Sequence, residues 1–128
     1  MSCIDPAQLP EQLNSGAAEL NYSHYVGDTI VMDYGYQDST GAVINLTGSI
    51  VTLEIRRKQS DPEPLFAYSS ADGTLQLNVD PTTQIKATIN DAHTTQLGEG
   101  EHHYFIKCQD SNGIVDTLLF GLISLKLR

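Results

Sequence analysis

The chain has 128 residues, of which 40% are hydrophobic and 18% are charged. This length allows one domain that buries a core without disulfides or metals, and the composition is typical of a globular protein. Its 16 acidic and 7 basic residues give a net charge of -9, which argues against binding to nucleic acid or to an anionic membrane, because both require clustered lysine and arginine.

Residues 1–16 are poor in large apolar side chains and contain Pro6, Pro10 and Gly16. We expect this segment to be a flexible, extended N-terminal arm, followed by a β-sandwich domain over residues 17–128. The N-terminus has no basic region followed by a long apolar run, so we expect no secretory signal and a cytosolic chain at synthesis.

Alternation of apolar and polar residues predicts strands over residues 17–26, 29–37 and 49–58. In the third of these, Val51, Leu53 and Ile55 alternate with polar residues, as in a strand with one buried face. The preceding residues 38–41 have the composition of a tight turn, because Asp and Ser bond to their own backbone and Gly supplies positive φ.

The second half of the chain continues the same pattern, with strands predicted over residues 65–69, 75–79, 85–89 and 101–109. Between the last two, Asn90 or Asp91 is expected to cap a short helical segment that ends at Gly98. Asn112 and Gly113 then favour a hairpin with a primed turn.

The last predicted strand, residues 114–127, is the most apolar and is apolar on both faces. One face would carry Val115, Thr117, Leu119, Gly121, Ile123, Leu125 and Leu127. Leu118, Phe120 and Leu122 would lie on the other face. This strand is either central and covered on both sides, or its second face packs against another subunit, because large apolar patches usually mark contacts.

Roughly eight short strands separated by Gly, Pro and Asn turns predict an all-β fold, a single antiparallel β-sandwich. Its motifs occur in a distinctive order: Gly27-Asp28-Thr29, residues 38–48 (DSTGAVINLTG), residues 51–56 (VTLEIR), residues 71–75 (ADGTL), residues 94–100 (TTQLGEG) and Asn112-Gly113. From residue 26 to residue 127 this order resembles that of tailed-bacteriophage virion structural proteins with an immunoglobulin-like module similar to the N-terminal domain of upper-baseplate proteins.

The resemblance implies a single immunoglobulin-like sandwich with a structural role and no catalytic residues. It implies an assembly adaptor of the tail, baseplate or neck, or alternatively a capsid decoration protein. The chain would then be located in the virion after synthesis in the host cytoplasm. Its partners would be other virion proteins and copies of itself, with no nucleic acid, membrane or cofactor.

The residues that could carry chemistry have simpler structural interpretations. His102 and His103 are neighbours in a predicted strand, so they point to opposite faces and cannot readily bind one metal. Cys108 could pair with His103 and Asp110 as a nucleophile, but its place in mid-strand favours core packing. We expect Cys3 to be an exposed thiol. We therefore expect no catalytic, cofactor or metal site.

Tyr22, Tyr25, Tyr34 and Tyr36 form an aromatic-rich stretch that could stack on a sugar ring in a host-facing carbohydrate-binding module. The structural alternative, that Tyr34 and Tyr36 fill the core, is favoured. The residues predicted to contact a partner are Leu118, Phe120, Leu122, Tyr22 and Tyr25.

Overall fold

The computed structural model describes residues 18–35, 45–58, 61–80 and 83–127. The expected arm, the turn at residues 38–41, Tyr36 and Cys3 lie outside the described residues. The strands are β1 (Ala18–Glu19), β2 (Tyr22–Tyr25), β3 (Ile30–Tyr34), β4 (Ile50–Arg56), β5 (Phe66–Ser69), β6 (Leu75–Asp80), β7 (Thr83–Ile89), β8 (Gly100–Gln109) and β9 (Val115–Lys126), and the helix is α1 (Asp91–Leu97). Within this part of the chain, no helix is long and apolar enough to cross a membrane.

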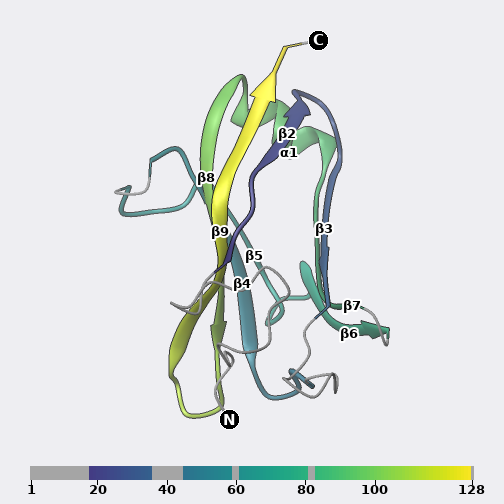
Figure 1. Ribbon diagram of the computed structural model, residues 1–128, viewed down its shortest axis with the longest axis vertical. Coiled ribbons are helices and arrows are strands. Elements are labelled where there is room, and N and C mark those ends of the chain that lie inside the picture. Colours follow the sequence, from purple (N-terminus) through teal and green to yellow (C-terminus); the bar gives the residue numbers. More distant parts are fainter. Residues whose placement is uncertain (1–17, 36–44, 59–60, 81–82, 128) are drawn as a thin grey trace.

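The strands form two sheets that pack as a sandwich (Figure 1). The larger sheet has the order β1-β9-β8-β4-β5, with β2 also on β9, and the smaller has the order β3-β7-β6. The fold is an immunoglobulin-like β-sandwich, as predicted. One detail differs from the predicted antiparallel sandwich: β1 and β2 run parallel to β9.

Alternation places the core where the sequence predicted it. Val51, Leu53 and Ile55 of β4 are 0% exposed. They lie opposite Cys108, Ile106 and Tyr104 of β8, which are also fully buried. The smaller sheet covers them with six buried apolar residues: Ile30, Met32, Leu75, Ile85, Ala87 and Ile89. Both inner faces therefore follow from the period-2 pattern.

The predicted strand at residues 17–26 is interrupted at Leu20 and Asn21, where the chain crosses very close to β9. The backbone N–H of Leu20 donates to the carbonyl of Phe120 at 3.0 Å. The hydroxyl of Tyr104 donates to the carbonyl of Leu20 at 2.7 Å. Gly121 makes this approach possible, since a Cβ at that position would lie 1.9 Å from the Leu20 carbonyl oxygen.

The short helix forms as expected. The side chain of Asn90 caps it by accepting a hydrogen bond from the His93 N–H at 2.8 Å, and Gly98 ends it with φ of 77°. Immediately beyond, His102 is 1% exposed, and its Nε2 donates to the carbonyl of Gly98 at 3.0 Å. The sequence predicted only that His102 and His103 point to opposite faces, and it did not indicate this burial. His102 fixes the start of β8 to the backbone upstream, the role that a tyrosine has at this corner of many immunoglobulin-like domains.

The hairpin between β8 and β9 is present, but its turn is not primed. The N–H of Gly113 donates to the carbonyl of Asp110 at 3.0 Å, and Gly113 has φ of 83°. Asn112 is not among the residues with positive φ. The Asp110 carboxylate accepts from the N–H groups of Asn112 and Ile114, at 2.9 and 3.0 Å. These bonds stabilise a three-residue loop with glycine at the left-handed position in place of a two-residue turn.

Candidate protein-binding surface

The outer face of the larger sheet carries a cluster of apolar side chains. Phe105 of β8 and Phe120 of β9 lie directly opposite each other, and Leu122 lies two residue pairs further, opposite His103. All three apolar side chains are half-buried. They point outward because their neighbours Tyr104, Ile106, Leu119 and Ile123 point into the core. We call Phe105, Phe120 and Leu122 the outer apolar cluster.

Beyond a polar row of Thr52, Lys107 and Thr117, two more apolar side chains lie at the hairpin end of the sheet. Ile50, Gln109 and Val115 form one row across β4, β8 and β9. Ile50 is 42% exposed and Val115 is 55% exposed. The sequence alone did not single out Phe105, Ile50 or Val115. The alternation of these residues with buried neighbours indicated that they face outward. Only the pairing of β4, β8 and β9 places them on one surface.

Leu118 does not belong to this surface, and its prediction as a partner contact is wrong. A β-bulge separates the pair Ile106–Leu119 from the pair Lys107–Thr117, so Leu118 is the extra residue on β9. It is 1% exposed and packs in the core, as does Leu119. The bulge also reverses which side chains point outward. Val115 and Thr117 therefore share the outer face with Phe120 instead of the inner face with Leu119.

The two tyrosines predicted as partner contacts lie in different environments. Tyr22 packs its ring edge-on against Tyr104, with 5.7 Å between ring centroids, and its hydroxyl bonds to that of Tyr34. Tyr22 is thus part of the edge of the core and is not an outer contact. Tyr25 is 49% exposed and lies opposite Lys126 at the far end of the larger sheet from the hairpin.

The outer face also carries a small ionic network. One carboxylate oxygen of Glu54 lies 2.8 Å from Arg56 Nη2 and 3.1 Å from Lys107 Nζ. Partial burial alone would raise the pKa of Glu54, but hydrogen bonds from Arg56 and Lys107 outweigh it and hold the pKa below its usual value. Glu54 therefore stays ionised beside Phe105, its neighbour across the strand pair.

The charges on this face balance. Six charged residues point outward from β1, β4, β8 and β9: Glu19, Glu54, Glu101, Arg56, Lys107 and Lys126. They comprise three of the chain's 16 acidic residues and three of its 7 basic residues. The formal charge of the outer face is zero, and the rest of the chain carries the full net charge of -9.

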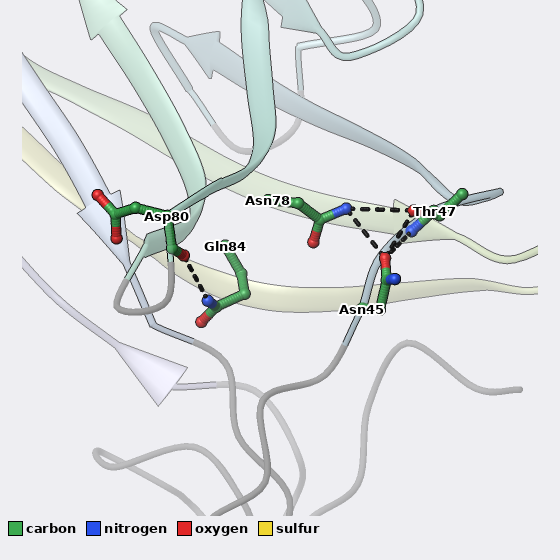
Figure 2. A pocket seen from close by; sticks show the side chains of 5 residues that line it. All are labelled: Asn45, Thr47, Asn78, Asp80 and Gln84. Atoms are coloured by element: carbon green, nitrogen blue, oxygen red, sulfur yellow. Dashed lines mark hydrogen bonds between the residues drawn. The ribbon is translucent and has the colours of Figure 1, made fainter.

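A second feature is an open polar pocket of about 240 Å³ where β6 and β7 meet the segment before β4 (Figure 2). Its lining residues are Asn45, Thr47, Asn78, Asp80 and Gln84. Asn78 has a left-handed φ of 52°, and its amide Nδ2 donates to Asn45 Oδ1 at 3.1 Å while its Oδ1 accepts from the Leu46 N–H at 3.2 Å. The polar groups of these residues form hydrogen bonds with one another. The bonds of Asn78 join β6 to the segment before β4.

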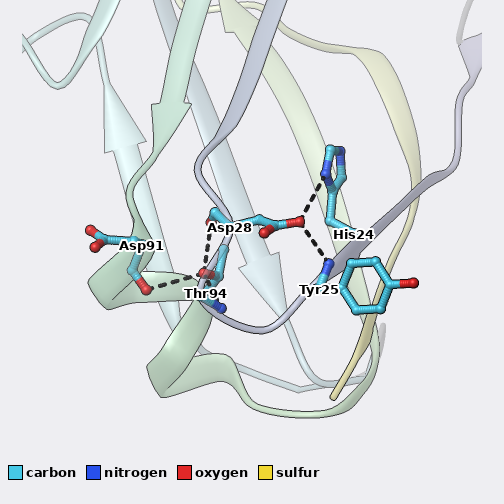
Figure 3. Close-up of polar contacts among 6 residues, drawn as sticks. His24, Tyr25, Asp28, Asp91 and Thr94 are labelled. Carbon is cyan, nitrogen blue, oxygen red and sulfur yellow. Dashed lines mark hydrogen bonds and ion pairs between the residues drawn. The ribbon is translucent and has the colours of Figure 1, made fainter. Parts of the chain in front are cut away.

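A third polar group joins the β2–β3 turn to α1 (Figure 3). The hydroxyl of Thr94, which is 0% exposed, accepts from the Gly27 N–H at 3.1 Å and donates to the carbonyl of Asp28 at 2.8 Å. The Asp28 carboxylate accepts from the Tyr25 N–H at 2.9 Å and lies 3.7 Å from His24 Nδ1. Two motifs of the resemblance, at residues 27–29 and 94–100, therefore bind each other and serve the fold.

The groups that could have formed a nucleophilic or metal site do not come together. Cys108 is buried as expected, but it is disulfide-bonded and carries no free thiol. His103 points to the opposite face of β8, and Asp110 is occupied by the hairpin turn. Across the residues that the structure describes, no group of three His, Cys, Asp or Glu side chains could hold a metal ion.

Stability should fall at alkaline pH. Tyr68 is buried beneath His93, to which its hydroxyl bonds, and burial raises the pKa of Tyr68 to about 12. Because the folded state retains this proton longer than the unfolded state, the stabilisation is complete below pH 10 and is lost as the pH rises from 10 toward 12. One tyrosine contributes a slope of at most about 1.4 kcal/mol per pH unit.

We expect Tyr68→Phe to reduce that slope in urea-unfolding experiments between pH 9 and pH 11. Tyr25→Phe, at an exposed position, is the matched control. A Tyr68→Phe variant with the same pH dependence as the wild type would contradict the expectation.

Comparison with known proteins adds little. No protein-family profile and no curated protein matches the chain. Among solved structures, murine CRIg is similar with a TM-score of 0.37 and 16% sequence identity, over 86% of this chain and 92% of that chain. A likeness this distant says nothing about activity, and the immunoglobulin-like fold rests on the two sheets described above.

Proposed function

We propose that this chain is a non-enzymatic structural protein of a tailed-phage virion, an assembly adaptor of the tail, baseplate or neck. The observation that carries the assembly role is the outer apolar cluster on a charge-balanced sheet face, in a chain of net charge -9. The virion assignment comes from the order of the sequence motifs, which cover residues 26–127.

Attachment through this face has a simple physical basis. Phenylalanine side chains supply large apolar contact areas and dominate the energetics of many interfaces. Phe105 and Phe120 lie at the centre of the face, and the ionic network of Glu54, Arg56 and Lys107 lies at its side. This arrangement of an apolar centre with a charged rim is typical of protein–protein contacts.

The side chains that an enzyme would need are used elsewhere in this fold. His102 holds the start of β8, Asp110 holds the hairpin, and Asp28 holds the β2–β3 turn. These uses support a module that acts by binding.

Deleting the gene from the phage that encodes this chain tests the proposal. We expect particles that lack a tail, baseplate or neck part in electron micrographs and a loss of infectivity that the wild-type gene restores. Complete particles with normal infectivity would contradict the assembly role. Complete particles that fail only to adsorb to cells would favour a host-facing carbohydrate-binding module, and complete but fragile heads would favour a capsid decoration protein.

Tyr25 and the polar pocket are the two features that a carbohydrate-binding module could use. β2, which ends at Tyr25, lies near α1, whereas β6 and β7, which supply lining residues of the pocket, lie toward the opposite end of the sandwich (Figure 1). Because the two features are separated, they cannot form one sugar site. This geometry favours the assembly role.

A further inference from the structure

We propose that the outer face of the larger sheet binds a second copy of this chain in a two-fold symmetric, face-to-face dimer. The outer apolar cluster of one copy would lie over the same cluster of the other. This inference rests on the proposed assembly role and identifies a second copy of the chain as the partner that this face binds. Its evidence is the distribution of charge, the size of the face and the arrangement of its side chains.

Charge is the first argument. Two copies of a chain with net charge -9 repel each other over most of their surfaces. On the outer face of the larger sheet, three acidic and three basic residues cancel. Two identical chains can therefore approach closely here without bringing uncompensated charge together. A strongly basic partner would instead be drawn to the acidic remainder of the surface.

Self-complementarity is the second argument. A two-fold interface places the same surface on both sides, so it needs an apolar centre and a rim that carries both signs of charge. Phe105 and Phe120 provide that centre. Lys107 and Arg56, with the Glu54 carboxylate that bonds both, leave one side of the cluster with a net positive charge, and Glu19 lies on the other side, on β1. Rotation by a half turn brings the basic side of one copy over the acidic side of the other.

The size of the face is the third argument. The adjacent strands β9, β8, β4 and β5 have 12, 10, 7 and 4 residues, which at about 3.3 Å per residue and about 4.8 Å between strands span roughly 500 Å² in projection. A standard interface buries about 800 Å² of accessible surface on each partner, which a pleated face of this extent with protruding aromatic side chains can supply. Two sheets stacked in this way lie about 10 Å apart, with their side chains interdigitated.

Sedimentation equilibrium of the purified full chain between about 5 and 200 µM tests the proposal. We expect a dimer of twice the chain mass of 14.0 kDa. Phe120→Glu places a charge at the centre of the interface and should weaken association by at least about 30-fold. Leu122→Gln, which adds no charge, should weaken it less and serves as a second variant.

Val31→Glu is the matched control, because it introduces the same residue on the outer face of the smaller sheet, where Val31 is 48% exposed. It should remain dimeric. Circular dichroism must show that each variant is folded. Raising NaCl from 50 to 500 mM should strengthen the wild-type dimer, since salt screens the repulsion between two chains of charge -9.

Several results would overturn the inference. A wild-type monomer across the concentration range would do so, as would a trimer or larger ring, or a dimer that survives Phe120→Glu. If the chain is a monomer that still enters particles, the dimer is refuted and the proposed function stands. If it is a dimer that is absent from particles, the dimer stands and the proposed function is refuted.

Discussion

Replacing Gly121 with alanine is expected to lower the free energy of unfolding by about 3 kcal/mol, or roughly 10 °C in melting temperature. The new Cβ would lie 1.9 Å from the carbonyl oxygen of Leu20 and 2.8 Å from Asn21 Oδ1. The nearest atom belongs to the backbone, so no side-chain rotation relieves the clash. The chain around Leu20 must move away from β9, which breaks its hydrogen bond to the carbonyl of Phe120.

Chemical denaturation measures the total loss, and hydrogen exchange locates it. The amides of β2 should lose protection in Gly121→Ala before those of β4 and β8. Ser124→Ala, a small change on the same strand, should leave stability within about 0.5 kcal/mol of the wild type. If Gly121→Ala were equally stable, the close crossing of Leu20 over β9 would be wrong.

Replacing Tyr104 with alanine should cost about 4 kcal/mol, because its ring is fully buried against Tyr22 and the loss leaves a cavity. Tyr104→Phe keeps the ring and removes only the hydroxyl. It should cost about 1 to 2 kcal/mol, since the carbonyl of Leu20 loses the phenol that donates to it at 2.7 Å. Urea unfolding of both variants separates the contribution of packing from that of the hydrogen bond.

Tyr104 and Gly121 act on the same carbonyl group, so their effects should not add. In the double variant Gly121→Ala with Tyr104→Phe, the displaced Leu20 carbonyl has no bond left to lose. We expect a total loss smaller than the sum of the two single losses, by about 1 kcal/mol. Simple additivity would indicate that the two residues stabilise independent parts of the fold.

Much of the fold could be predicted from alternation alone. The inner residues of β4, β7 and β8 follow a strict period of two, and the helix was indicated by Asn90 and Gly98 at its ends. These signals are local, since each depends only on neighbouring residues. The tight hairpin was located correctly, but its turn type depends on the carboxylate of Asp110 bonding two N–H groups, which composition does not reveal.

The faces of β9 could not be predicted, because a single extra residue changes them. The bulge at Leu118 shifts the alternation, so a reading that assumes an uninterrupted period of two assigns Val115 and Thr117 to the core. The break in the first strand has a similar origin, since it arises from contact with Gly121 about a hundred residues away. Only the pairing of distant strands reveals either feature.

The outer surface of β9 was predicted in part. Phe120 and Leu122 were assigned to the second face of the last strand, and the structure places them on an outer surface beside Phe105. Whether that surface contacts a partner is the subject of our proposal. His102 was missed because adjacent histidines gave no indication that one would be buried and bonded to the carbonyl of Gly98.

The assembly role is tested most directly by the copy number of this chain in phage particles purified on a density gradient. Quantitative mass spectrometry would compare particles from cells supplied with the wild type, Phe120→Glu or Val31→Glu. The account predicts a fixed copy number for the wild type and for Val31→Glu, and at least a tenfold reduction for Phe120→Glu. Particles that lack the wild-type chain, or that contain Phe120→Glu at the wild-type level, would contradict it.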